Sequence, residues 1–139
     1  MSSKKFLLLF ARLCIGAVFL VNIQAGFDFF LHPQNYTSAY ELAGIPGEVS
    51  VAGVGLLFLM WNVPYAFALW NPLKFRISLI QANLMQLIGV GGETFILFRI
   101  SAVDHLVLVS SIQRFIIFDI VGLLLLIIAW ILTKLAIKK

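Results

Sequence analysis

The sequence predicts an all-α polytopic membrane protein, a bundle of four transmembrane helices with a short interfacial helix in its first outer loop. Composition is the first reason: 62% of the residues are hydrophobic, 12% are charged, and the mean hydropathy is +1.05. Soluble domains average about 45–50% apolar and about 25% charged residues. Length is the second reason, because 139 residues hold four helices of about 20 residues each, joined by short loops. We therefore expect a single domain, residues 1–139, without a separate soluble module.

Four apolar runs are the predicted spans, and they cover about residues 6–31, 48–70, 77–100 and 114–133. Each is long enough to cross a bilayer as a helix, and none shows the alternating pattern of a membrane barrel strand. Pro72 stands just after the second run, where proline cannot continue a helix. We expect a tight turn between the second and third spans.

The N-terminal run has a competing interpretation as a secretory signal peptide, because Lys4 and Lys5 precede it. However, the run is longer than the core of about 7–15 residues that such signals have, and no small-residue cleavage site follows. We expect it to remain as a span. Cys14 is the only cysteine, so an internal disulfide is excluded, and we interpret it as a small packing residue.

Basic residues predict the orientation, because they concentrate beside the cytoplasmic ends of spans. Only Arg99 and Arg114 fall on one side of the predicted bundle. We expect a multi-pass protein of the cell (inner or plasma) membrane with both termini in the cytoplasm. The orientation then explains the net charge of +4, and nucleic-acid binding is not needed to account for it. Anionic lipid headgroups are the natural partners of these basic residues. The basic residues on the cytoplasmic side are Lys4, Lys5, Arg12, Lys74, Arg76, Lys134, Lys138 and Lys139.

All six carboxylates fall in the predicted outer half, and two of them, Glu93 and Asp119, lie deep inside spans. A charge near the centre of the hydrocarbon costs about 2.5–3.5 kcal/mol on insertion scales, so such groups normally face the bundle interior or water. Helical spacing places both on faces of small and polar residues. These faces are Ala82, Gln86, Gly89 and Glu93 in the third span, and Asp119, Gly122, Leu126, Ala129 and Thr133 in the fourth. The corresponding faces are Glu48, Ala52, Gly55, Leu59 and Asn62 in the second span, and Ala17, Val21, Gln24 and Asp28 in the first.

Two interpretations of these faces remain open. In the first, they are packing faces on which polar side chains bond across closely approaching helices. In the second, the ionisable groups line an outward-opening pocket that binds a polar headgroup or relays protons. The candidate residues for the polar pocket or helix–helix contacts are Gln24, Asp28, Gln86, Glu93, Asp119, Arg99 and Arg114. The candidates for close helix packing are Gly89, Gly91, Gly92 and Gly122.

The first outer loop, residues 32–47, predicts a short helix lying on the membrane surface. Ser38 and Glu41 match a capping box, Gly44 can terminate the helix, and Pro46 restarts the chain before the second span. Tyr40 lies at headgroup depth in this interpretation, where aromatic belts occur.

The N-terminal third resembles a known family. The residues that carry the resemblance are Arg12, Gly16, Phe19 and Leu20 in the first span, then Ala25-Gly26-Phe27-Asp28-Phe29 and Pro33. Over residues 12–47 they are similar to the opening helix and first loop of DoxX-like small membrane proteins. The resemblance implies four transmembrane helices and a place among subunits of quinone-linked oxidoreductases or membrane partners of redox enzymes. Asp28 departs from the family, since many relatives carry a basic residue there.

The sequence lacks the signatures of soluble enzymes, such as a phosphate-binding glycine loop, zinc-ligand spacing or Cys-x-x-Cys. We therefore expect an accessory subunit without catalysis of its own, packed against larger membrane partners in a respiratory or photosynthetic electron-transfer complex. No metal or cofactor of its own is expected, beyond a quinone or bound lipid. The alternatives are a DoxX-like quinone-associated oxidoreductase subunit with outward-facing carboxylates, and a small homo-oligomeric transporter or channel.

Overall fold

The computed structural model describes residues 3–138, and regular structure within this range is entirely helical. The prediction of an all-α chain is therefore confirmed for these residues, whereas Lys139 lies outside them. The long helices are α1 (Ser3–Leu31), α2 (Gly44–Trp70), α3 (Arg76–Leu97) and α4 (Leu106–Ile137). Two short 3-10 helices, η1 (Pro33–Asn35) and η2 (Thr37–Tyr40), occupy the first loop.

Helices α1, α2 and α4 are long and apolar enough to cross a membrane. Helix α3, with 22 residues, is not among them, because its sequence interleaves polar residues with apolar ones. Helix α4 begins at Leu106, well before the predicted span start at residue 114. Arg114 consequently lies inside α4 and not at its outer boundary.

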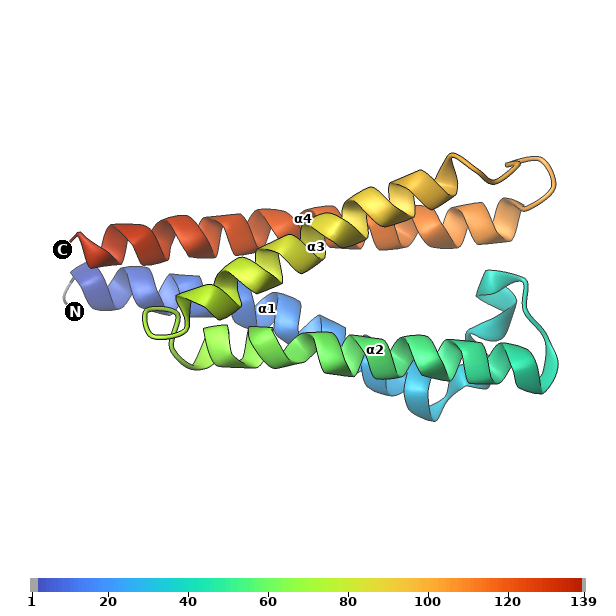
Figure 1. Cartoon of the computed structure of the whole chain (residues 1–139), viewed down its shortest axis with the longest axis horizontal. Coiled ribbons are helices and arrows are strands. Elements are labelled where there is room, and N and C mark those ends of the chain that lie inside the picture. The colour runs from blue at the N-terminus through green and yellow to red at the C-terminus, as the bar shows by residue number, and fades with distance from the viewer. Residues whose placement is uncertain (1–2, 139) are drawn as a thin grey trace.

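The four long helices run side by side (Figure 1). The beginning of α1, the end of α4 and the turn between α2 and α3 lie at one end, which we call the basic end. The loop with η1 and η2 and the loop between α3 and α4 lie at the opposite end. Helices α2 and α3 are close at the basic end and diverge toward the other end.

The core at the basic end consists of small and aliphatic side chains. Ile15, Leu79 and Leu126, from α1, α3 and α4, are fully buried there together with Ala68 of α2. The α2–α3 turn has the predicted tight form. Oδ1 of Asn71 accepts hydrogen bonds from the backbone N–H groups of Leu73 and Lys74. These contacts hold the four helices together at the basic end. Helices α2 and α3 diverge only toward the opposite end.

Glycines allow α1 and α2 to cross closely. A Cβ on Gly55 of α2 would lie 2.5 Å from the backbone nitrogen of Phe30 and 2.8 Å from the carbonyl oxygen of Gly26. A Cβ on Gly26 of α1 would lie 2.9 Å from the Leu59 side chain. The backbones therefore approach as only glycine permits.

The first outer loop differs from its prediction. Its residues form η1 and η2 in place of one capped helix, and Glu41 comes after η2 with a left-handed φ of 55°. Its side chain does not close a capping box on Ser38, because it contacts α4 instead: Oε2 lies 2.6 Å from Nδ1 of His105, and Oε1 accepts the Leu108 N–H at 3.3 Å. Gly44, expected to end a helix, begins α2 with a φ of 63°. Contacts between distant segments override the local capping signal here.

Candidate functional site: a polar cavity between diverging helices

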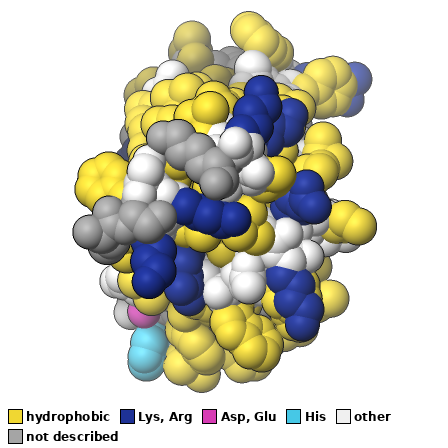
Figure 2. All heavy atoms as spheres, turned by 90° about the vertical axis from the view of Figure 1, so that its left-hand side faces the viewer, with side chains coloured by type: hydrophobic (Ala, Val, Ile, Leu, Met, Phe, Trp, Pro, Cys, Tyr) yellow, Lys and Arg dark blue, Asp and Glu magenta, His cyan; other side chains and the backbone are white. Residues whose placement is uncertain are grey.

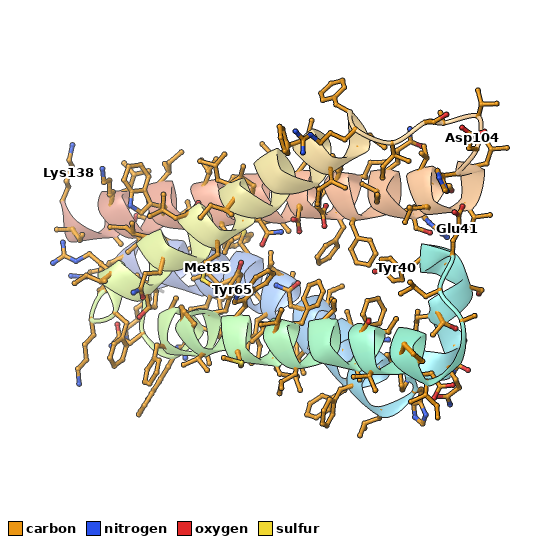
Figure 3. All side chains as sticks on the ribbon, turned by 45° about the vertical axis from the view of Figure 1, so that its right-hand side comes forward. Tyr40, Glu41, Tyr65, Met85, Asp104 and Lys138 are labelled. Carbon is orange, nitrogen blue, oxygen red and sulfur yellow. The ribbon has the colours of Figure 1, made fainter. Side chains whose placement is uncertain are left out.

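A cavity of about 420 Å³ lies where α2 and α3 diverge. We call it the polar cavity. Its walls combine apolar and aromatic side chains with a few polar groups, which is the usual composition of a small-molecule site. The polar and aromatic residues that line it are Asn22, Phe58, Trp61, Tyr65, Gln86, Glu93 and Asp119. Tyr65 of α2 and Met85 of α3, both in its lining, lie in the region between these two helices (Figure 3).

A chain of hydrogen bonds crosses one wall of the polar cavity. The hydroxyl of Tyr65 donates to Oε1 of Gln86 at 2.7 Å, and Nε2 of Gln86 donates to Oδ1 of Asp119 at 2.7 Å. Tyr65 is 2% exposed and Gln86 is 4% exposed, so the bond between them is buried, whereas the Gln86–Asp119 bond is partly buried. This chain joins α2, α3 and α4 and fixes the orientation of the amide and the carboxylate.

Two glycines make room for these polar side chains. A Cβ on Gly122 of α4 would lie 2.7 Å from Nε2 of Gln86, and a Cβ on Gly89 of α3 would collide with Oδ2 of Asp119. On each of the two helices, a glycine therefore contacts the polar side chain of the other helix. Close approach at small residues with a polar bond across the contact is typical of membrane helix pairs.

Glu93 is the polar group of this cavity that the protein leaves incompletely satisfied. Its Oε2 atom is buried and has no hydrogen-bond partner among residues 3–138. An unpaired buried polar atom costs about 1–3 kcal/mol, so such atoms in native structures call for a specific explanation. Glu93 lines both the polar cavity and a smaller neighbouring cavity of about 300 Å³.

A second cavity, of about 450 Å³, lies toward the loop end between α1, α4 and the first loop. We call it the aromatic cavity. The ring of Phe29 is central, because its centroid lies 4.5 Å from that of Tyr36, 6.2 Å from Tyr40 and 6.0 Å from Phe115. Phe58 lines both this cavity and the polar cavity, so the two share a wall.

Tyr40 extends from η2 into the space between α2 and α4 (Figure 3). Its ring stacks on Phe115 with centroids 6.2 Å apart. Burial raises the pKa of its phenol above the ordinary value, the carboxylate of Glu93 raises that pKa further, and Arg114 opposes the rise. Tyr40 therefore closes the loop end of the cavities, a contact that its position in the sequence does not predict.

The loop that carries Tyr40 is held by the ion pair between Glu41 and His105. Hydrogen bonding to Glu41 raises the pKa of the His105 imidazole, and the same bond lowers the pKa of the Glu41 carboxyl. Glu41 also accepts the third free N–H of α4, so a residue from a distant segment serves as the cap of that helix. The ion pair and the cap together fix the loop over the cavities.

The structure brings together only some of the predicted site residues. Gln86, Glu93 and Asp119 line the polar cavity, and Arg114 lines the aromatic cavity, where it donates to Oγ of Ser111 at 3.0 Å. The other three, Gln24, Asp28 and Arg99, line none of the cavities described here. Gln24 is exposed, Asp28 is half-buried at the end of α1, and the guanidinium of Arg99 lies 4.8 Å above the Phe95 ring.

Of the four glycines predicted for close packing, two lie at a helix contact and two are exposed. Gly89 and Gly122 lie at the α3–α4 contact, as described above. Gly91 and Gly92 are exposed, and a Cβ on either would meet no atom within 4 Å.

Sequence reasoning missed Asn22 and Tyr65 as members of the site. The face predicted for the first span does not pack inside the bundle, because Ala17, Val21 and Gln24 are exposed. The buried face of α1 is Ala11, Ile15, Val18, Asn22, Gly26 and Phe29. The spacing of Asn22 from Val18 and Gly26 is a helical signal that points to the correct face.

Comparisons with known proteins find no match for this chain: no protein family, no curated protein and no solved structure is similar to it at a significant level.

Proposed function

We propose that this chain is a small integral membrane protein with four spans that binds the polar head of a membrane-soluble quinone in the polar cavity. The observation that carries the proposal is the buried, unpartnered Oε2 of Glu93 in the lining of a cavity of about 420 Å³. Ionisable groups inside membrane spans usually mark sites of binding or proton transfer. In this proposal α3 is a span as well, since 22 residues extend about 33 Å and the hydrocarbon core is about 30 Å thick.

The chemistry of the cavity fits a quinone headgroup. A quinol hydroxyl donates to Oε2 of Glu93, which satisfies the carboxylate oxygen that the protein leaves unpaired. A quinone carbonyl accepts from a side-chain amide, and Asn22 and Gln86 supply amides in the same cavity. Trp61 and Phe58 offer flat apolar surface for the ring. The resemblance of residues 12–47 to DoxX-like proteins supports the same ligand class.

The orientation in this proposal places the basic end in the cytoplasm and the cavities in the outer leaflet. The loop with η1 and η2 then covers the outer mouth of the site. The protein supplies binding and positioning, and the oxidation chemistry belongs to the quinone and to the larger electron-transfer complex in which we place this subunit.

A binding titration tests the proposal. In nanodiscs that contain the full chain, a short-chain quinol should quench the fluorescence of Trp61, and Trp61→Phe should remove most of the quenching. Glu93→Gln should weaken quinol binding by about tenfold, because an amide takes the place of the carboxyl group that the proposed hydrogen bond uses. Glu48→Gln is the matched control, since Glu48 lines none of the cavities described here, and it should bind like the wild type. Equal affinities for Glu93→Gln and Glu48→Gln would contradict the proposal.

A second candidate function, an accessory subunit that packs against larger membrane partners, is favoured by α3. This helix is the least suited to face lipid, and its exposed Gly91 and Gly92 leave room for another helix to approach. Mild-detergent purification followed by mass spectrometry should recover heavier chains with the wild type, and Gly92→Leu should lose them. Gly53→Leu, at an exposed glycine of α2 with equally open surroundings, should retain them. Recovery of the chain alone would exclude this role.

A further inference from the structure

A groove of about 520 Å³ lies at the basic end, between the start of α3 and the end of α4. We call it the basic groove. It is separate from the cavities at the other end, and its lining combines three cations with aliphatic side chains. These residues are Lys74, Arg76, Lys134, Ile77, Ile80 and Ile137. Dark-blue Lys and Arg side chains gather on this end of the molecule with apolar surface between them (Figure 2).

The three cations come from the α2–α3 turn, the start of α3 and the end of α4. Lys74 lies in the α2–α3 turn, and its backbone N–H donates to Oδ1 of Asn71 at 3.0 Å. Arg76 is the first residue of α3, so the free N–H groups and the positive dipole of that helix end lie beside it. Nζ of Lys134, in the last turn of α4, lies 3.5 Å above the ring of Trp130. The aromatic ring orders the Lys134 ammonium at the edge of the groove.

Among residues 3–138, no acidic side chain pairs with these positive charges. The six Asp and Glu side chains of the chain belong to the described residues, and none lines the basic groove. The ion pair found among residues 3–138 is that of Glu41 with His105, at the opposite end. A cluster of uncompensated cations beside helices that are apolar enough to cross a membrane selects an anionic partner at the membrane surface.

We infer that the basic groove binds one anionic phospholipid. Its phosphate is held by the guanidinium of Arg76, which matches phosphate oxygens with two parallel N–H bonds, and by the ammonium groups of Lys74 and Lys134. An acyl chain lies along Ile77 and Ile80, which follow Arg76 in α3 away from the basic end. The aliphatic half of the groove identifies the occupant as a lipid, since a free phosphate ion has nothing to bury there. This inference is independent of the quinone proposal, because the two sites lie at opposite ends of the bundle.

Native mass spectrometry of the detergent-solubilised full chain tests the inference. Phosphatidylglycerol should remain bound with one-to-one stoichiometry, while phosphatidylcholine should not. The triple variant Lys74→Gln, Arg76→Gln, Lys134→Gln should weaken phosphatidylglycerol binding at least about tenfold. The control variant Lys4→Gln, Lys5→Gln, Lys138→Gln removes the same charge from the same end but outside the groove, and it should bind normally. Equal losses in the two variants would show unspecific charge attraction and overturn the inference.

A competition experiment separates the lipid from its phosphate group. Excess inorganic phosphate should leave phosphatidylglycerol bound, and displacement would show a simple anion site, contrary to the inference. If the triple variant does not fold, the cations can be left intact. In a Trp61→Phe, Trp70→Phe background, where Trp130 is the remaining tryptophan, brominated phosphatidylglycerol should quench its fluorescence more strongly than brominated phosphatidylcholine. Equal quenching by both lipids would overturn the inference.

Discussion

The side-chain amide of Gln86 on α3 donates a 2.7 Å hydrogen bond to the carboxylate of Asp119 on α4. The same amide lies against Gly122, and the same carboxylate lies against Gly89. The contact is therefore reciprocal, with a polar side chain from each helix set on a glycine of the other. The hydrogen-bonded pair lines the same cavity as Glu93, whose Oε2 atom has no partner among the described residues.

The Gln86–Asp119 bond should contribute measurably to stability. Gln86→Met removes the donor and leaves the Asp119 carboxylate without it, so the free energy of unfolding should fall by about 1–3 kcal/mol. In a double-mutant cycle with Asp119→Ala, the combined loss should be smaller than the sum by at least about 0.5 kcal/mol. Steric-trap or SDS-titration unfolding measures these values. Gln81→Met, at an exposed position of the same helix, is the control and should be nearly neutral. Additive losses would show that the bond contributes nothing.

Gly89 should not tolerate a larger side chain. Gly89→Ala places a methyl group where Oδ2 of Asp119 lies, and such overpacking costs about 1–3 kcal/mol. The midpoint of thermal unfolding in detergent should therefore fall. Gly91→Ala, two residues away with no atom within 4 Å of the added methyl, should raise it slightly through its better helix propensity. Similar midpoints for the two variants would contradict the close contact between α3 and α4.

Gly55 should be the most sensitive glycine of α2. The methyl group of Gly55→Ala would meet backbone atoms of α1, the nearest at 2.5 Å, and backbone cannot rotate aside as a side chain can. We expect the helices to separate, with a loss of about 2 kcal/mol or more and reduced recovery of folded protein. Gly53→Ala, on the open side of the same helix, is the matched control. Equal recovery and stability of the two variants would rule out the close crossing of α1 and α2.

The loop over the cavities should open as the pH rises. Because the pKa of His105 is raised in the folded protein, its stabilisation of the loop is complete below the ordinary pKa of 6.5. This stabilisation is lost as the pH rises through the higher pKa of the folded state. Because the pKa of Glu41 is lowered in the folded protein, its stabilisation of the loop is present above the ordinary pKa of 4.5. This stabilisation is lost as the pH falls through the lower pKa of the folded state. The ion pair is therefore intact between 4.5 and 6.5 and breaks on the alkaline side above this range.

Hydrogen–deuterium exchange checks this pH dependence. After correction for the intrinsic rate, residues 33–43 should be better protected at about pH 6 than at about pH 9. His105→Gln should abolish the difference, since glutamine does not titrate. His32→Gln, in the same loop but outside the ion pair, should preserve it. A wild-type loop with the same protection at both pH values would show that the ion pair does not hold it.

How far the sequence predicts the packing depends on the helix. In α4 the series Gly122, Leu126, Ala129 and Thr133 is buried, as its spacing predicts. The face of α3 with Ala82 and Gln86 is also buried. In both helices the small and polar residues stand out against the apolar ones, and this contrast marks the face turned toward protein.

In α1 the same method fails. The buried face contains Ile15 and Val18, while exposed positions of the same helix carry Leu13, Leu20 and Val21. A helix that is apolar on every side has no pattern that separates lipid-facing from protein-facing positions. The placement of Ala17 and Gln24 at helical spacing therefore marks a side of α1 that is exposed in the bundle.

The sequence by itself determined the helical class, the α2–α3 turn and the separation of basic residues from carboxylates, because these depend on composition and on near neighbours along the chain. Only the tertiary structure decided that Glu41 pairs with His105 and not with Ser38, and that Tyr40 enters the bundle. It also decided that Tyr65 completes the chain of bonds to Asp119. Each of these contacts joins segments far apart in the sequence, and its geometry depends on how closely the glycines let the helices approach.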